Sequence, residues 1–240
     1  MKKEFTLDEI SKVPYYGKKF PFIPWSFGSK IRVSIVFAKV LYRKIGLVKF
    51  ATFWLYIFPI KSISIYRKNK EGLKLMQEAF GKMAQIEWFL LIVIYRYLEQ
   101  LKDADFAYAF AKEAIQEASK FMMRDFYQAK ILSQFEDPFE AFWLYHKAMF
   151  EDDPNYPNEL IDEGDCKTMI VHECKNCIIA QLTIPELAKL GCDHDITGYK
   201  SIEKLVKMEF RRPQTIAKDD KPCQFMFFKE GTAPENIKIK

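Results

Sequence analysis

Hydrophobic positions in the middle of the chain recur at steps of three and four residues. This spacing places them on one face of an α-helix and predicts a long helix over residues 70–101. A second stripe of the same kind predicts another long helix over residues 104–132. The stretch 138–150 follows Asp137, a good N-cap residue, and has Pro138 at the first helical position, so it predicts a shorter third helix.

Shorter helices are predicted before residue 70. The pattern Thr6-Leu7-Asp8-Glu9 is a capping box, in which a hydroxyl and a carboxylate each satisfy a backbone N–H. A helix over residues 30–45 is expected to end at Gly46, since glycine is favoured just past a helix end. Another helix is expected over residues 47–58.

Downstream of residue 165 the apolar period shifts toward two, which is typical of strands. Residues 167–172 are rich in strand-forming side chains, and residues 177–190 predict a helix with a break at Pro185. Residues 204–212 and 223–228 alternate and predict an antiparallel hairpin. The sequence therefore predicts an α+β protein, with an N-terminal helical bundle followed by a small antiparallel-sheet α+β module.

The composition divides the chain into five segments. A basic, aromatic N-terminal helical arm is expected over residues 1–68, and a helical region over residues 69–151. The acidic, proline-broken stretch 152–165 is interpreted as a linker. A cysteine-bearing α+β module over residues 166–228 and a flexible tail over residues 229–240 complete the chain.

The charge is distributed unevenly. Residues 1–70 hold 15 Lys/Arg and three acidic residues, a net charge of +12, whereas the remainder carries −7. Such an arm suits peripheral contact with an anionic membrane surface, or packing against the acidic remainder of its own chain. The apolar run 50–60 has 11 residues, whereas a membrane span needs roughly 20. No transmembrane segment, targeting segment or nucleic-acid partner is expected, and the protein is predicted to be cytoplasmic.

All five cysteines lie within the last third of the chain, between residues 166 and 223. The odd number and the expected compartment favour thiols over a disulfide framework. Cys174 and Cys177 form a Cys-x-x-Cys pair, which suits a redox pair or half of a zinc site. His172 or His194 could complete a metal site, but neither a metal nor another cofactor is expected.

The densest group of reactive side chains is Gly191-Cys192-Asp193-His194-Asp195. A thiol, an imidazole and two carboxylates this close together can supply a nucleophile, a base and an orienting acid. The alternative is a turn between helices, where Gly and Asp are common. Arg212 at the end of a strand can hold a carboxylate through two parallel hydrogen bonds.

Several short motifs occur in an order that resembles the L-2-amino-thiazoline-4-carboxylic acid hydrolase family. That family has a Cys, a Cys-x-x-Asp, an Arg-x-x-Thr-[Leu/Ile]-Ala and a final Cys-x-Phe-x-Phe. Here the corresponding positions are Cys174, Cys192 with Asp195, Arg212 to Ala217, and Cys223 to Phe227. The resemblance covers about residues 80–228, and Lys218 stands where the family usually has Gly.

The resemblance implies an enzyme that hydrolyses a C–N bond in a cyclic amidine of the 2-aminothiazoline-carboxylate type. Its implied catalytic residues are Cys174, Cys192, Asp195 and His194, with either cysteine as the nucleophile. Its implied substrate-binding residues are Arg212, Thr215, Cys223 and His172. The layout is also similar to the 4-vinyl-reductase-like domains, which implies the alternative of a non-catalytic module that binds or senses a small molecule.

Overall fold

The computed structural model describes residues 6–18, 27–219 and 221–240, and the chain divides into two compact units. The sheet unit comprises Met1–Ser29, Ser119–Cys174 and His194–Lys240, and the helical unit comprises Lys30–Ala118 and Lys175–Asp193. Each unit is therefore assembled from segments that are far apart in sequence.

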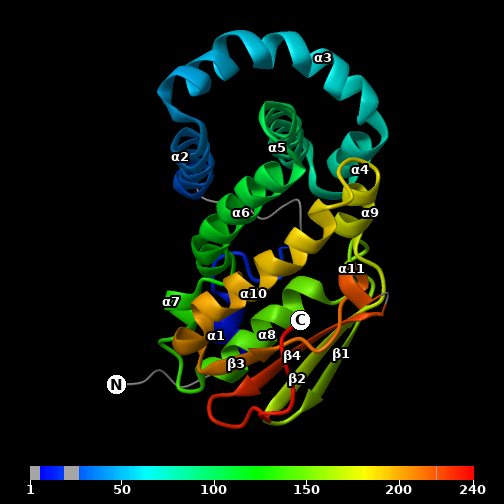
Figure 1. Cartoon of the computed structure of the whole chain (residues 1–240). Helices are drawn as coiled ribbons and strands as arrows, with labels where there is room; N and C mark the ends of the chain where they lie inside the picture. Colours follow the sequence, from blue (N-terminus) through cyan, green and yellow to red (C-terminus); the bar gives the residue numbers. More distant parts are fainter. Residues whose placement is uncertain (1–5, 19–26, 220) are drawn as a thin grey trace. The chain divides into compact units, whose positions relative to one another are not determined.

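The helical unit consists of helices, most of which follow one another closely along the chain (Figure 1). They are α2 (Phe27–Thr52), the π-helix η1 (Phe53–Ile57), α3 (Phe58–Lys68), α4 (Lys70–Phe80), α5 (Lys82–Leu101), the first part of α6 (Ala104–Phe126) and α9 (Lys175–Gln181). In Figure 1, α2, η1 and α3 form a continuous curve that passes around α5.

The sheet unit contains helices and a four-stranded antiparallel sheet, whose strands lie in the order β1-β2-β4-β3. Its strands are β1 (Asn158–Glu163), β2 (Cys166–Val171), β3 (Met208–Arg211) and β4 (Cys223–Lys229). Its helices are α1 (Leu7–Ser11), α7 (Ala129–Leu132), α8 (Pro138–Phe150), α11 (Ile216–Asp219) and most of α10 (Leu187–Val206).

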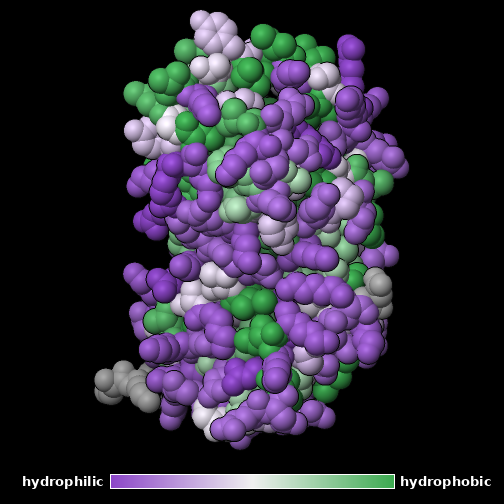
Figure 2. All heavy atoms as spheres, viewed as in Figure 1, coloured by the Kyte–Doolittle hydropathy of each residue, from purple (hydrophilic) through white to green (hydrophobic). Residues whose placement is uncertain are grey.

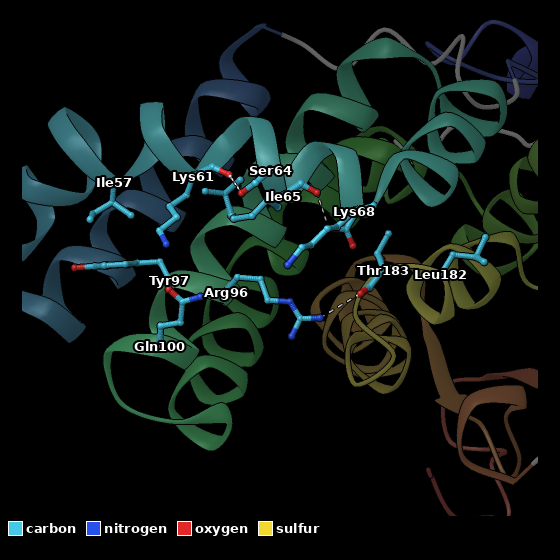
Figure 3. Close-up of a pocket in the computed structure, with 12 residues that line it drawn as sticks. Ile57, Lys61, Ser64, Ile65, Lys68, Arg96, Tyr97, Gln100, Leu182 and Thr183 are labelled. Atoms are coloured by element: carbon cyan, nitrogen blue, oxygen red, sulfur yellow. Dashed lines mark hydrogen bonds between the residues drawn. The ribbon is translucent and has the colours of Figure 1, made fainter.

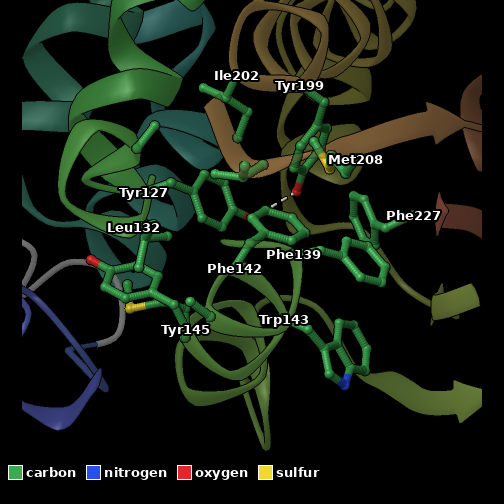
Figure 4. Close-up of a cluster of buried hydrophobic side chains, with 14 of the residues drawn as sticks. Tyr127, Leu132, Phe139, Phe142, Trp143, Tyr145, Tyr199, Ile202, Met208 and Phe227 are labelled. Atoms are coloured by element: carbon green, nitrogen blue, oxygen red, sulfur yellow. Dashed lines mark hydrogen bonds between the residues drawn. The ribbon is translucent and has the colours of Figure 1, made fainter. Parts of the chain in front are cut away.

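An aromatic core joins α8 to the sheet (Figure 4). The rings of Phe142 and Phe227 meet edge to face with centroids 5.1 Å apart, a favoured aromatic arrangement. Alternation along β4 explains how the sheet supplies its share, because Cys223, Phe225 and Phe227 are buried while Gln224 and Met226 are partly exposed. The core therefore forms where the period-two pattern of β4 meets the apolar face of α8.

The predicted α+β class, with helices followed by an antiparallel sheet, is confirmed. Helix α8 has the predicted bounds, and the Asp137 carboxylate accepts hydrogen bonds from the N–H groups of Phe139 and Glu140, both at 3.1 Å. The predicted hairpin is present as β3 paired with β4. At these positions, the N-cap residue and the alternation of apolar and polar residues were sufficient to predict the helix and the two strands.

The two long helices predicted in the middle of the chain are each interrupted. Gly81 has φ +89° and separates α4 from α5, because glycine adopts this conformation without steric cost. Gln128 has φ +50° and separates α6 from α7. Gly46, with φ +75°, breaks the helical conformation inside α2 as predicted. The predicted end of a helix at residue 58 is wrong, because α3 begins at Phe58 and accommodates Pro59 in its first turn.

The region after residue 175 departs from the prediction in three places. The predicted helix 177–190 is the end of α9 and the start of α10, with Pro185 between them. Residues 191–195 lie inside α10 rather than in a turn, because the helix continues to Val206. Only residues 208–211 of the predicted strand 204–212 are extended, since Lys207, with φ +54°, forms the turn between α10 and β3.

Two connecting segments are more ordered than predicted. The expected linker 152–165 contains β1, whose residues pair with β2 and so satisfy their backbone groups. The expected flexible tail returns to Arg212, where Ile239 forms a bridge and the Lys240 N–H donates to the Arg212 carbonyl at 2.9 Å. Among the described helices, none combines the length and apolar character required to span a bilayer.

Candidate functional site

A buried arginine lies at the centre of the candidate site in the sheet unit. Arg212 directly follows β3 and its side chain has no exposed surface. Its Nη1 donates to Oδ2 of Asp195 on α10 at 3.2 Å, and its Nη2 donates to the Lys240 main-chain oxygen at 2.9 Å. The guanidinium also lies 5.7 Å from the ring centroid of Phe225. These contacts compensate a cation that would otherwise be costly to bury.

Cys174 and Asp195 both interact electrostatically with the buried Tyr156. Cys174 lies between β2 and α9, and Tyr156 lies just before β1. Burial raises the pKa of Tyr156, and the nearby Cys174 and Asp195 charges raise the pKa further. The thiol and the carboxylate are therefore both within electrostatic reach of one phenol, and the same carboxylate binds Arg212.

A buried chain of hydrogen bonds begins beside this carboxylate. The Tyr199 and Tyr127 hydroxyls are 2.9 Å apart, and the Tyr127 hydroxyl is 2.6 Å from Nδ1 of His146. Figure 4 shows the two tyrosines meeting inside the aromatic core. Burial, followed by the charge of Asp195, raises the pKa of Tyr199, and burial lowers the pKa of His146 to about 3. The three hydrogen-bonded side chains are therefore all neutral at physiological pH.

Sequence reasoning did not identify Tyr127, His146, Tyr156 or Tyr199. Tyr199 follows Asp195 by four residues on one helix, so helical spacing could have placed it on the same face. The other three are supplied by α8, by the segment after α6 and by the segment before β1. No spacing in the sequence links those segments to α10.

Thr215 and Cys223 stabilise the start of α11. The fully buried Thr215 accepts a hydrogen bond from the Lys218 N–H at 3.1 Å through its hydroxyl. The Ile216 N–H points at Sγ of Cys223 at 3.2 Å. Thr215, three residues after Arg212, and Cys223, on β4, therefore both make structural contacts at the start of α11.

The two predicted histidines have different surroundings. His172 has a side chain that is 46% exposed, and its Nε2 lies 2.8 Å from Oε1 of Glu159. His194 is partly buried, with Nδ1 3.4 Å from Oδ1 of Asp195, and its buried Nε2 has no hydrogen-bond partner among the described residues. Of the two histidines, only His194 therefore contacts Asp195, the carboxylate that pairs with Arg212.

The remaining cysteines lie elsewhere in the fold. Cys192 is 8% exposed on α10 and belongs, with Cys177 on α9, to the helical unit. The Cys-x-x-Cys pair is therefore divided, because Cys174 is the last residue of its segment of the sheet unit. All five cysteines are present as thiols. Within residues 6–18, 27–219 and 221–240, no three His, Cys, Asp or Glu side chains are grouped as metal ligands.

The helical unit has a cavity of its own, of about 430 Å³ (Figure 3). Its wall includes the cationic side chains of Lys61, Lys68 and Arg96, and none of its lining residues is acidic. In Figure 3 the three cationic ends extend toward the same space. Arg96 is held there by Glu99 at 2.9 Å and by the Thr183 carbonyl at 3.4 Å. The cavity is therefore electrostatically suited to an anionic small molecule.

The sheet unit has an α+β fold in which the buried guanidinium of Arg212 is paired with the carboxylate of Asp195. The family model for L-2-amino-thiazoline-4-carboxylic acid hydrolase matches residues 71–227, a stretch that runs from α4 into β4 and includes Cys174, Asp195 and Arg212. The chain belongs to this family. Neither a curated protein nor a solved structure matches it significantly.

Proposed function

We propose that the protein hydrolyses a C–N bond in a cyclic amidine of the 2-aminothiazoline-carboxylate type, at the Cys174, Asp195 and Arg212 group. The observation that carries the proposal is the double role of Asp195, which binds Arg212 at 3.2 Å and shares the electrostatic surroundings of Tyr156 with Cys174. A nucleophile, a proton carrier and an anion-binding group are thereby available in one unit. The family membership supports the same class of reaction.

The chemistry follows from the ring carbon between nitrogen and sulfur, which is electrophilic once the amidine is protonated. In the proposed reaction the Cys174 Sγ bonds to this carbon, the ring C–N bond breaks and the leaving nitrogen takes up a proton. Water then adds to the same carbon, the Sγ–C bond breaks and the thiol is restored. One water is consumed for each ring opened, and Asp195, with His194 beside it, carries the protons.

Cys192 remains the alternative nucleophile. It precedes Asp195 by three residues on α10, but it is 8% exposed. Cys174 is favoured because it is partly exposed and belongs to the same unit as Asp195 and Arg212, whereas Cys192 is buried in the helical unit.

Arg212 is assigned to the substrate carboxylate. Both of its Nη groups already have oxygen acceptors, one from Asp195 and one from Lys240. A substrate carboxylate would therefore exchange with one of these acceptors rather than enter an unoccupied position.

The test is turnover of 2-amino-2-thiazoline-4-carboxylate by the full chain. Breaking the ring C–N bond releases an amine and no thiol, whereas breaking the C–S bond releases a thiol, so a thiol reagent distinguishes the two products. Cys174→Ser should lower kcat by at least about 100-fold, and Cys166→Ser, a change on β2, is the matched control. Full activity in both Cys174→Ser and Cys192→Ser would exclude a cysteine nucleophile, and a thiol product would exclude C–N cleavage.

The second candidate function is a non-catalytic module that binds a small anion. The cavity between α3 and α5, with Lys61, Lys68 and Arg96 in its wall, favours this reading. A ligand that raises Tm without being converted, and whose effect disappears in Lys61→Gln/Lys68→Gln, would support binding without hydrolysis.

A further inference from the structure

The curve formed by α2, η1 and α3 carries a continuous stripe of exposed apolar side chains. Val48 is 78% exposed, Leu55 69%, Ile60 70% and Ile63 61%. With Thr52 and Tyr56, their positions form two overlapping series with steps of three and four, 48-52-55 and 52-56-60-63, and so share one face. Figure 2 shows hydrophobic side chains gathered at the top of the view, over these elements. Exposed apolar residues are normal when isolated, but a contiguous stripe indicates an interaction surface.

The opposite face of the same elements packs within the helical unit. Phe53 has no exposed surface, and its ring centroid lies 5.0 Å from that of Tyr97 on α5. Phe58 approaches Phe89, also on α5, with centroids 6.5 Å apart. The stripe is therefore held outward by a buried aromatic contact behind it.

The charges around the stripe have one sign. From Phe27 to Lys68 there are nine Lys/Arg and no Asp/Glu. Arg43 and Lys44 are used internally, because both pair with Glu113 of α6. Lys49 and Arg67 are exposed and adjoin the stripe in sequence, whereas Lys61 lines the cavity on the other face. Long basic side chains beside an apolar stripe can extend to lipid phosphates while their stems stay on apolar surface.

We infer that the outer face of α2, η1 and α3 docks on the surface of a membrane that contains anionic lipid. The apolar stripe lies among the headgroups and upper acyl chains, and the flanking cations contact the anionic headgroups. Tyr56, 63% exposed within the stripe, suits the polar–apolar boundary that tyrosine favours in membranes. The surface lies outside residues 71–227, the part matched by the hydrolase family, so the inference is independent of the proposed reaction.

The test is flotation of the full chain with vesicles of phosphatidylcholine containing about 30 mol% phosphatidylserine, compared with phosphatidylcholine alone. The chain should float with the anionic vesicles only, and raising NaCl from about 0.1 to 0.5 M should weaken binding. Val48→Ser/Leu55→Ser/Ile60→Ser should reduce binding by about tenfold or more. Lys49→Gln/Arg67→Gln should weaken binding and reduce its dependence on salt.

The matched control removes three exposed apolar side chains elsewhere, as Leu7→Ser/Met83→Ser/Ile86→Ser. It should bind vesicles like the wild type, and circular dichroism should show that all variants are folded. Absence of flotation, or equal flotation of both triple variants, would overturn the inference. Sedimentation that shows a dimer abolished only by the stripe variant, without vesicle binding, would assign the surface to a second copy of the chain instead.

Discussion

The hydroxyl of Tyr127 lies 2.6 Å from Nδ1 of His146, and both side chains are fully buried. The Tyr127 ring is also stacked nearly parallel to the imidazole, with an interplanar angle of 4°. The His146 Nε2 has no hydrogen-bond partner among the described residues. The surrounding rings include those of Phe142, Phe150 and Phe227. An imidazole in such surroundings is stable only in its neutral form.

This environment makes the stability of the protein sensitive to mild acid. Burial lowers the pKa of His146 to about 3, whereas an unfolded histidine has a pKa of about 6.5. The contribution of His146 is therefore fully present above pH about 6.5 and is lost as the pH falls, because the unfolded state takes up a proton that the folded state does not. Between pH 6 and 5 its share should approach about 1.4 kcal/mol per pH unit.

Urea unfolding of the wild type and of His146→Phe at several pH values measures this effect. The variant keeps the hydrogen bond between Tyr127 and Tyr199, and its stability should depend less on pH in that window. His172→Gln, a change of a side chain that is 46% exposed, is the control and should keep the wild-type slope. An unchanged slope in His146→Phe would contradict the prediction.

A glycine in α4 is required by a close approach of the chain near α9. A Cβ added to Gly72 would lie 2.5 Å from Cγ2 of Thr183 and 3.2 Å from Cβ of Leu182. Gly72→Ala should therefore lower the free energy of unfolding by about 1–2 kcal/mol, although alanine favours helix. Gly72→Ala/Thr183→Ser, which removes Cγ2 and keeps the hydroxyl, should recover most of the loss.

The control for Gly72 is another helical glycine. Gly191 in α10 has nothing within 4 Å of the position of an added Cβ. Gly191→Ala should raise the free energy of unfolding by about 0.5–1 kcal/mol. Thermal or urea unfolding measures both changes, and equal effects of the two substitutions would show that helix propensity, rather than contact with Thr183, decides the outcome.

Loss of the Asp195 carboxylate should destabilise the sheet unit. Arg212 is fully buried, and without Asp195 its Nη1 loses a charged acceptor. We expect Asp195→Ala to lower the free energy of unfolding by about 2–3 kcal/mol. Glu78→Ala, which removes an exposed partner of Lys74, should change it by less than about 0.5 kcal/mol. Similar values for the two variants in urea unfolding would mean that the buried pair contributes no more to stability than the exposed pair.

The N-cap of α8 gives a prediction that separates hydrogen bonding from charge. Asp137 accepts from two backbone N–H groups and also pairs with Lys229 of β4 at 3.0 Å. Asp137→Ala should cost about 1–2 kcal/mol of stability. Asp137→Ser keeps a capping oxygen and loses the ion pair, so it should cost less. A Ser variant as unstable as the Ala variant would assign the effect to Lys229 rather than to the cap.

The parts of the fold that were predicted depend on neighbours in sequence. Asp137 followed by Pro138 determines the start of α8, and alternation in residues 223–228 identifies β4. The interruptions at Gly81 and Gln128 were missed, because the apolar stripe continues on both sides of each and conceals the change in backbone conformation. For the same reason, the helical pattern of α10 was missed where Gly191 and Asp193 suggested a turn.

Residues of the candidate site were predicted from the sequence only where they belong to the short motifs that resemble the hydrolase family. Asp195 and Arg212 were selected from the sequence, and the structure pairs them at 3.2 Å. Their catalytic and binding roles stay predictions, as do those of Cys174 and Cys192. Tyr127, His146 and Tyr156 come from other segments, and only tertiary packing brings them toward α10. In the sequence, a tyrosine or histidine that joins a buried hydrogen-bonded group cannot be distinguished from one that only packs in the core.

The return of the last residues to Arg212 has a practical consequence for experiments. The Lys240 N–H and main-chain oxygen both contact Arg212, and Lys240 Nζ lies 3.1 Å from Oδ1 of Asp219. An affinity tag joined after Lys240 would begin beside the guanidinium that is assigned to the substrate. Under the proposed role of Arg212, kinetic constants measured with such a fusion would describe an enzyme whose anion-binding group is crowded.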